Sequence, residues 1–75
     1  MTLDNADINK GYRLVSCDVP PKTRSKLETL GLVPGEHINV IQRTNAGLII
    51  EVKRSRLAIA HDLAESFVVH ELWEE

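Results

Sequence analysis

Apolar side chains alternate with polar ones along several short stretches of the chain, a pattern typical of half-buried β-strands. Five such stretches are present, and we predict strands at residues 12–17, 37–43, 48–53, 56–60 and 67–72. The segment 44–47 (Thr-Asn-Ala-Gly) is predicted to be a hairpin loop, because Asn and Gly tolerate positive φ. The pattern therefore favours a mainly β protein, a small and strongly bent antiparallel barrel of about five strands.

Residues 22–30 carry a helical pattern instead, with Leu27 and Leu30 on the inward face. Pro20 and Pro21 suit the entry to this helix, since the first turn leaves its N–H groups unbonded in any case. Asp18 is placed where it could help to cap the helix. A single helical turn is expected at residues 61–65, and Leu3, Ala6 and Ile8 form a weak helical face within residues 1–10.

The exit from the longer helix is the most informative stretch of the sequence. Gly31 stands where a helix end favours a left-handed residue, and in that position it would bring Leu27 into contact with Leu32. Residues 33–36 (Val-Pro-Gly-Glu) then carry the signature of a type II turn. In nine residues the chain is predicted to end a helix, reverse and enter a sheet.

Composition limits the class of protein. Seventy-five residues with 43% apolar and 27% charged side chains make one soluble domain, residues 1–75, with its core at about 12–69. A net charge of −2 argues against a dedicated nucleic-acid binder, and the single cysteine, Cys17, excludes an internal disulfide. Because no membrane-spanning run or signal peptide is apparent, a cytoplasmic protein is expected.

Two segments together resemble a known family. The first is R-x-x-L-x-x-L-G-L-x-P-G at residues 24–35, and the second is R-L-A-I-A-H-D-L-A-x-x-F-V-V at residues 56–69. They resemble the FeoA family, ferrous iron transport protein A, and the resemblance extends over about residues 12–69. It implies an SH3-like barrel with one or two short helices, working in the bacterial cytoplasm.

The resemblance also implies a function. Such proteins are non-enzymatic accessories of ferrous iron uptake that act with FeoB, a membrane transporter with a cytoplasmic GTPase domain. A similar domain closes some iron-dependent transcriptional repressors, so a transition-metal-binding or metalloregulator-like module is an alternative. A small-barrel nucleic-acid-binding protein is a second alternative, although no nucleic acid is expected as a partner. A monomer without direct membrane insertion is favoured.

The candidate metal ligands are His37, His61, His70 and Cys17. A transition metal needs three or four ligands that converge with fixed geometry, and none of these residues shows the usual paired spacing. We therefore expect no dedicated metal site and no cofactor. Catalysis is not expected either, because the serines lack a neighbouring histidine and acid, and no phosphate-binding loop is present.

The candidate functional residues are those of a partner-binding surface: Arg24, Leu30, Val33, Arg54, Arg56 and Trp73. Leu30 and Val33 either bind a partner or close the core. Arg43, Lys53, Arg54 and Arg56 are expected to be gathered by the hairpins, where they are either a solvated hairpin end or a docking site for an acidic protein surface. Trp73 either anchors the tail, contacts a partner or forms a self-association patch.

Overall fold

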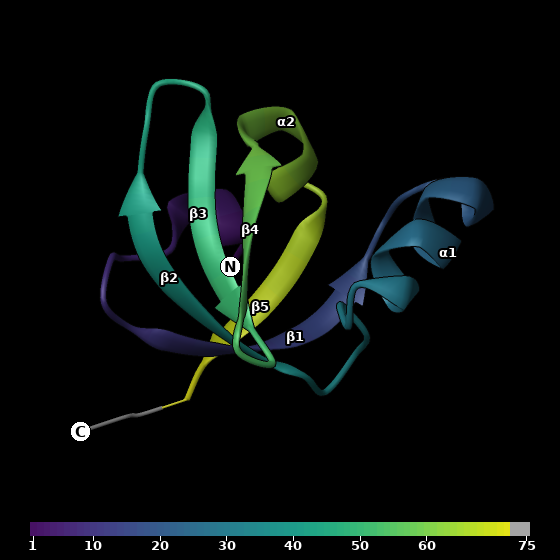
Figure 1. Ribbon diagram of the computed structural model, residues 1–75, viewed down its shortest axis with the longest axis horizontal. Helices are drawn as coiled ribbons and strands as arrows, with labels where there is room; N and C mark the ends of the chain where they lie inside the picture. Colours follow the sequence, from purple (N-terminus) through teal and green to yellow (C-terminus); the bar gives the residue numbers. More distant parts are fainter. Residues whose placement is uncertain (73–75) are drawn as a thin grey trace.

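The computed structural model describes residues 1–72 and contains one antiparallel sheet with short helical elements (Figure 1). In chain order the elements are η1 (Leu3–Asn5), β1 (Gly11–Cys17), α1 (Pro21–Thr29), β2 (His37–Arg43), β3 (Gly47–Val52), β4 (Ser55–Ala60), α2 (His61–Ala64) and β5 (Phe67–Glu71). The strands lie in the order β4-β3-β2-β1-β5. The prediction of five antiparallel strands is confirmed, and each predicted strand overlaps an observed one with ends that differ by at most one residue.

The register of the sheet is interrupted twice, and at these points the sheet curls. The N-terminal segment then pairs with the β5 edge. The pairing of β1 with β5 shifts between Leu14 and Ser16, and that of β2 with β3 shifts between Val40 and Gln42. Such bulges increase the local twist of a sheet. Thr2 forms a bridge with Val68, so the start of the chain extends the sheet beyond β5.

The concave side of the sheet holds the core. Every strand alternates buried and more exposed positions over part of its length, as expected for a sheet with one face in water. Leu3 and Ala6 from the N-terminal segment complete the core, whereas Ile8 is exposed, so the predicted helical face exists only in part. The buried apolar residues are Leu3, Ala6, Tyr12, Leu14, Leu27, Leu32, Ile38, Val40, Leu48, Ile50, Val52, Ile59, Ala64, Phe67 and Val69.

The helix exit confirms the sequence prediction in detail. Gly31 has φ of 96°, its N–H bonds to the Glu28 carbonyl at 3.0 Å, and the Leu32 N–H bonds to the Leu27 carbonyl at 2.9 Å. These two hydrogen bonds define a Schellman motif. Gly35, with φ of 95°, forms the type II turn that follows.

The helix entry differs from its prediction. The N-cap residue of α1 is Pro20, no side chain caps the helix, and Asp18 instead donates its backbone N–H to the Ser66 carbonyl at 2.9 Å. The prediction that Asp18 helps to cap the helix is therefore wrong. The rigid φ of Pro20 and Pro21 starts the helix without a side-chain cap.

Gly47 lies where two strands approach too closely for a side chain. A Cβ atom at this position would stand 2.1 Å from the Ile59 carbonyl oxygen and 2.8 Å from the Ala60 Cα. Both contacts are with backbone atoms, which cannot rotate away. The β3–β4 pairing therefore requires glycine here for steric reasons.

A polar cluster at one end of the barrel joins three segments that are distant in sequence. His61, the first residue of α2, places Nδ1 2.6 Å from the Asp4 carboxylate and Nε2 3.0 Å from the Thr44 carbonyl oxygen. Arg43 donates to the backbone carbonyls of Asp4 at 2.9 Å and Ala6 at 2.6 Å. The Asp4 carboxylate and the Thr44 carbonyl oxygen are both hydrogen-bond acceptors, so a doubly protonated imidazolium ring donates a hydrogen bond to each of them at once. We call His61, Asp4, Thr44 and Arg43 the latch.

Substitution of Gly47 by Ala should destabilise the protein by about 3 kcal/mol, because β3 and β4 must separate to admit the new methyl group. Gly35→Ala is the matched control: it has open space around its Cβ position and costs only the left-handed strain, about 1 kcal/mol. Urea denaturation of both variants measures the two effects. Equal destabilisation, or a larger effect at Gly35, would contradict the steric account.

The hydrogen bonds of His61 in the latch should make the free energy of unfolding depend on pH. The hydrogen bond to Asp4, followed by that to Thr44, raises the pKa of His61 above its ordinary value. A group with a raised folded pKa stabilises the fold fully below about pH 6.5, its unfolded value, and loses that contribution as the pH rises through the folded pKa.

We therefore expect the thermal midpoint of His61→Gln to lie below that of the unsubstituted protein at pH 5.5 and to converge with it at pH 8.5. Thermal unfolding monitored by circular dichroism across this range makes the comparison. Curves that run parallel at every pH would show that protonation of His61 does not stabilise the latch.

Candidate functional site

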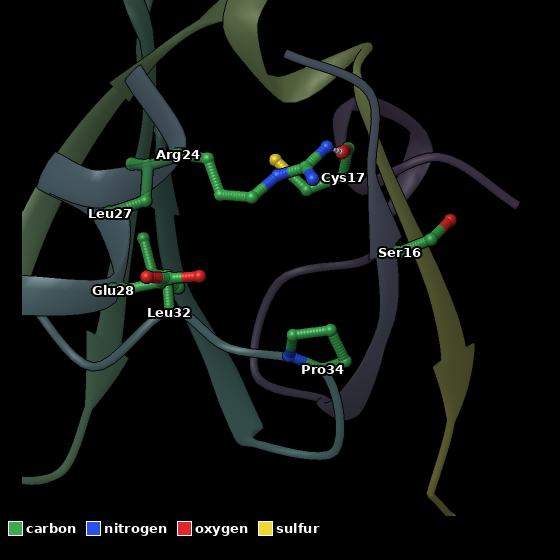
Figure 2. Close-up of a pocket in the computed structure, with 7 residues that line it drawn as sticks. All are labelled: Ser16, Cys17, Arg24, Leu27, Glu28, Leu32 and Pro34. Carbon is green, nitrogen blue, oxygen red and sulfur yellow. Dashed lines mark hydrogen bonds between the residues drawn. The ribbon is translucent and has the colours of Figure 1, made fainter. Parts of the chain in front are cut away.

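A groove of about 330 Å³ lies between α1 and β1 (Figure 2). We call it the α1 groove; its lining residues are Ser16, Cys17, Arg24, Leu27, Glu28, Leu32 and Pro34. It is open to solvent, and α1 projects from the side of the sheet rather than lying flat across it (Figure 1). The groove is therefore a surface feature that another molecule can reach.

One wall of the groove is the end of β1. In the ladder with β5, Ser16 lies opposite Val68, and the Asp18 N–H bonds to the Ser66 carbonyl. Because backbone groups alternate in direction along an antiparallel strand, those of Cys17 point away from β5 and toward α1. The Cys17 carbonyl oxygen accepts a hydrogen bond from the Arg24 guanidinium at 3.1 Å, which Figure 2 shows crossing the groove.

The other wall is α1 with the turn that follows it. Leu27 and Leu32 are buried and form an apolar floor, held together by the Schellman hydrogen bonds. Arg24 and Glu28 are exposed and stand one helical turn apart, so each can meet an opposite charge on a bound molecule. The groove thus combines apolar surface, one cation and one anion.

Cys17 contributes to the groove without being reactive. Burial raises the pKa of its thiol, an effect only partly offset by the nearby Arg24. A thiol that stays protonated is a poor nucleophile and a poor metal ligand. Cys17 therefore serves the groove through its backbone carbonyl and its bulk.

The predicted partner-binding residues fall into two neighbouring groups. Arg24 lines the α1 groove, Leu30 at the helix end is 48% exposed, and Val33 is half-buried just beyond it. Leu30 does not belong to the buried core, so the core-closure interpretation fails for it, and binding stays a prediction. Trp73 lies outside the described residues.

Arg54 lies in the turn between β3 and β4, Arg56 is the second residue of β4, and both are exposed. A Cβ atom on Gly31 would stand 3.3 Å from Cδ of Lys53, which shows how closely the turn approaches the exit. Lys53 itself lies 3.6 Å from the Glu36 carboxylate. The surface around the helix exit is therefore cationic on one side.

Arg43 does not belong to this cationic group, and the prediction that the hairpins gather it with Lys53, Arg54 and Arg56 is wrong. Arg43 lies opposite Leu48 at the start of β3, whereas the turn is at the other end of that strand. The six residues of β3 separate the two ends by roughly 17 Å. Arg43 is used in the latch instead.

The described residues offer little for metal chemistry or catalysis. Among residues 1–72, no three His, Cys, Asp or Glu side chains lie close enough to hold a metal ion. The His61–Asp4 pair has the geometry of a base with its orienting acid, but the second ring nitrogen is occupied by the Thr44 carbonyl. His61 is thus not positioned to take a proton from a serine.

Of the residues that line the groove, sequence reasoning named only Arg24 as partner-binding. It assigned Leu27 and Leu32 to the core, weighed Cys17 only as a metal ligand, and gave no site role to Ser16, Glu28 or Pro34. These four residues become neighbours only when α1 folds back beside β1. No spacing in the sequence encodes that approach. Within residues 1–72, no helix has the length and apolar character needed to cross a membrane.

Comparison with known proteins places this arrangement in a family. The profile of the FeoA domain matches residues 1–70. No curated protein matches the chain significantly. The solved structures do match, and three of them are informative.

The FeoA protein from Chlorobium tepidum is 25% identical, with a TM-score of 0.91 over 100% of this chain and 73% of its own. A crystal structure of an iron uptake regulatory protein, FeoA, is 30% identical, with a TM-score of 0.86 over 96% of this chain and 97% of its own. FeoA from Stenotrophomonas maltophilia was solved with zinc and is described as a prokaryotic SH3 domain protein. It is 24% identical, with a TM-score of 0.78 over 92% of this chain and 88% of its own. The predicted SH3-like architecture is confirmed, and the chain belongs to the FeoA domain family, which is associated with ferrous iron transport.

Proposed function

We propose that this protein is a non-enzymatic cytoplasmic accessory of ferrous iron uptake, which docks on the cytoplasmic part of a FeoB-type transporter. The observation that carries the proposal is the α1 groove, an accessible site with apolar floor and charged rim in a domain that belongs to the FeoA family. Leu30 at its end, together with Arg54 on the adjoining turn and Arg56 at the start of β4, extends the proposed docking surface.

The chemistry of the groove supports docking rather than a reaction. Its polar groups are one guanidinium, one carboxylate, a serine hydroxyl and a protonated thiol, with no base beside the hydroxyl. Such a set can orient a peptide by hydrogen bonds and ion pairs but offers no route for proton transfer. Family membership agrees with an accessory role.

The small size of the site favours a reversible complex. A groove of about 330 Å³ with a few exposed neighbours fits a modest interface of the transient type. Docking of this kind alters the transporter only if its nucleotide states present different surfaces to the accessory protein. The proposed mechanism is therefore a shift in the assembly or in the nucleotide-linked conformational balance of the partner.

A binding experiment with the cytoplasmic GTPase domain of the transporter from the same organism tests the proposal. We expect a complex with this protein in at least one nucleotide state. Arg24→Glu and Leu30→Ser should each weaken it by about tenfold, since one reverses a charge in the groove and the other removes exposed apolar surface.

Lys22→Gln is the matched control, because Lys22 is an exposed cation of the same helix that does not line the groove. It should bind as well as the unsubstituted protein. Calorimetry without nucleotide, with GDP and with a non-hydrolysable GTP analogue covers the relevant states. The absence of a complex in all three would overturn the proposed function.

A further inference from the structure

Three basic side chains form a row across the outer face of the sheet. Arg13 on β1 lies directly opposite His37 on β2 and directly opposite His70 on β5. Residues opposite one another in an antiparallel ladder project from the same face. Their chain neighbours Tyr12, Leu14, Ile38 and Val69 are buried, so the three basic residues point outward, and all three are exposed. We call them the basic row.

The row has no acidic partner within the three strands that carry it. The positions two residues away, which share its face, are Gly11 and Val15 on β1, Asn39 on β2, and Val68 on β5, with Leu72 just past the end of β5. The neighbouring carboxylates are engaged elsewhere: Glu36 lies 3.6 Å from Lys53, and Glu71 lies 2.7 Å from Lys10.

On the adjoining strand β3, Glu51 is the carboxylate nearest to the row. It lies opposite Asn39 and so shares the face of the row, but it is diagonal to His37 and has the cation Arg56 directly opposite on β4. Beside β5, the N-terminal segment brings an ammonium group that donates to the Val69 carbonyl, a further cation. In the ladders of the described residues, no carboxylate therefore lies directly opposite a member of the row.

We propose that the basic row binds an acidic helical face of a partner protein. Adjacent strands lie about 4.8 Å apart, close to the 5–6 Å between side chains three or four residues apart on a helix, so one carboxylate can meet each member of the row. The planar guanidinium of Arg13 matches a central carboxylate in a bidentate pair. Val15 and Val68 beside the row provide apolar contact.

Other ligands fit this row less well. His37 and His70 are separated by the whole of β1, roughly 10 Å, which is too far for one metal ion. Single-stranded nucleic acid is bound mainly by stacking on aromatic side chains, and Tyr12 and Phe67, the aromatic residues of the described part, are buried. An acidic protein surface requires only the charges that the row presents.

The row extends the proposed function and rests on it only for the identity of the partner. It lies on the outer face of β1, whereas the α1 groove lies at the edge of the same strand. A single partner that occupied both would contact this protein at two separate places.

The test uses an alanine-based helical peptide with Glu at every fourth position, titrated into the ¹⁵N-labelled protein at low salt. We expect the largest chemical-shift changes at Arg13, His37 and His70, which share one face of the sheet. Arg13→Gln should weaken binding about tenfold or more. The same peptide with Gln in place of Glu should not bind.

Two matched variants keep the result interpretable. Lys22→Gln removes one exposed cation elsewhere and should bind the peptide normally, and so should His61→Gln, because His61 lies in the latch. Arg13→Gln should unfold at about the temperature of the unsubstituted protein, since Arg13 is exposed and forms no ion pair within residues 1–72.

Three results would overturn the inference: shift changes centred on α1, unchanged affinity in Arg13→Gln, or tighter binding of a short oligothymidylate than of the peptide. Loss of stability in Arg13→Gln would likewise show that the row is structural. Failure of the transporter domain to bind overturns the proposed function but leaves peptide binding at the row unaffected, so the two failures are distinguishable.

Discussion

Gly31 holds a left-handed backbone conformation between a helix and a turn, and the position of α1 depends on it. With φ of 96°, it lets Leu32 fold back to the Leu27 carbonyl and directs the chain toward β2. An L-residue in that conformation suffers a clash between its Cβ and the following carbonyl. Without this reversal α1 would not stand beside β1, and there would be no groove between them.

The groove and the basic row both use β1, but through different properties of the strand. The groove depends on the direction of backbone groups, because the Cys17 carbonyl leaves the ladder and meets Arg24 at 3.1 Å. The basic row depends on the direction of side chains, because Arg13 shares its face with His37 and His70. A strand that is paired on both sides at its start and on one side only at its end can therefore offer two surfaces with different chemistry.

The three histidines illustrate how environment gives one residue type different roles. His61 is surrounded by acceptors, Asp4 and the Thr44 carbonyl, so a proton on its ring strengthens the fold. His37 and His70 stand on either side of Arg13 on the outer face, where their exposed rings are available to a bound molecule. One residue type thus joins distant segments at one end of the barrel and forms part of an exposed surface on its outer face.

The sequence by itself determined the elements and the reversal at Gly31, since alternation, proline and glycine act through local sterics that neighbouring residues settle. It also carried the resemblance that the family comparison confirmed. It did not reveal the α1 groove, the latch or the basic row, and it wrongly gathered Arg43 with Lys53 and Arg54. Strand register and the packing of α1 decided these features, because they depend on which distant backbones pair, and a shift of one residue would turn every side chain of a strand to the opposite face.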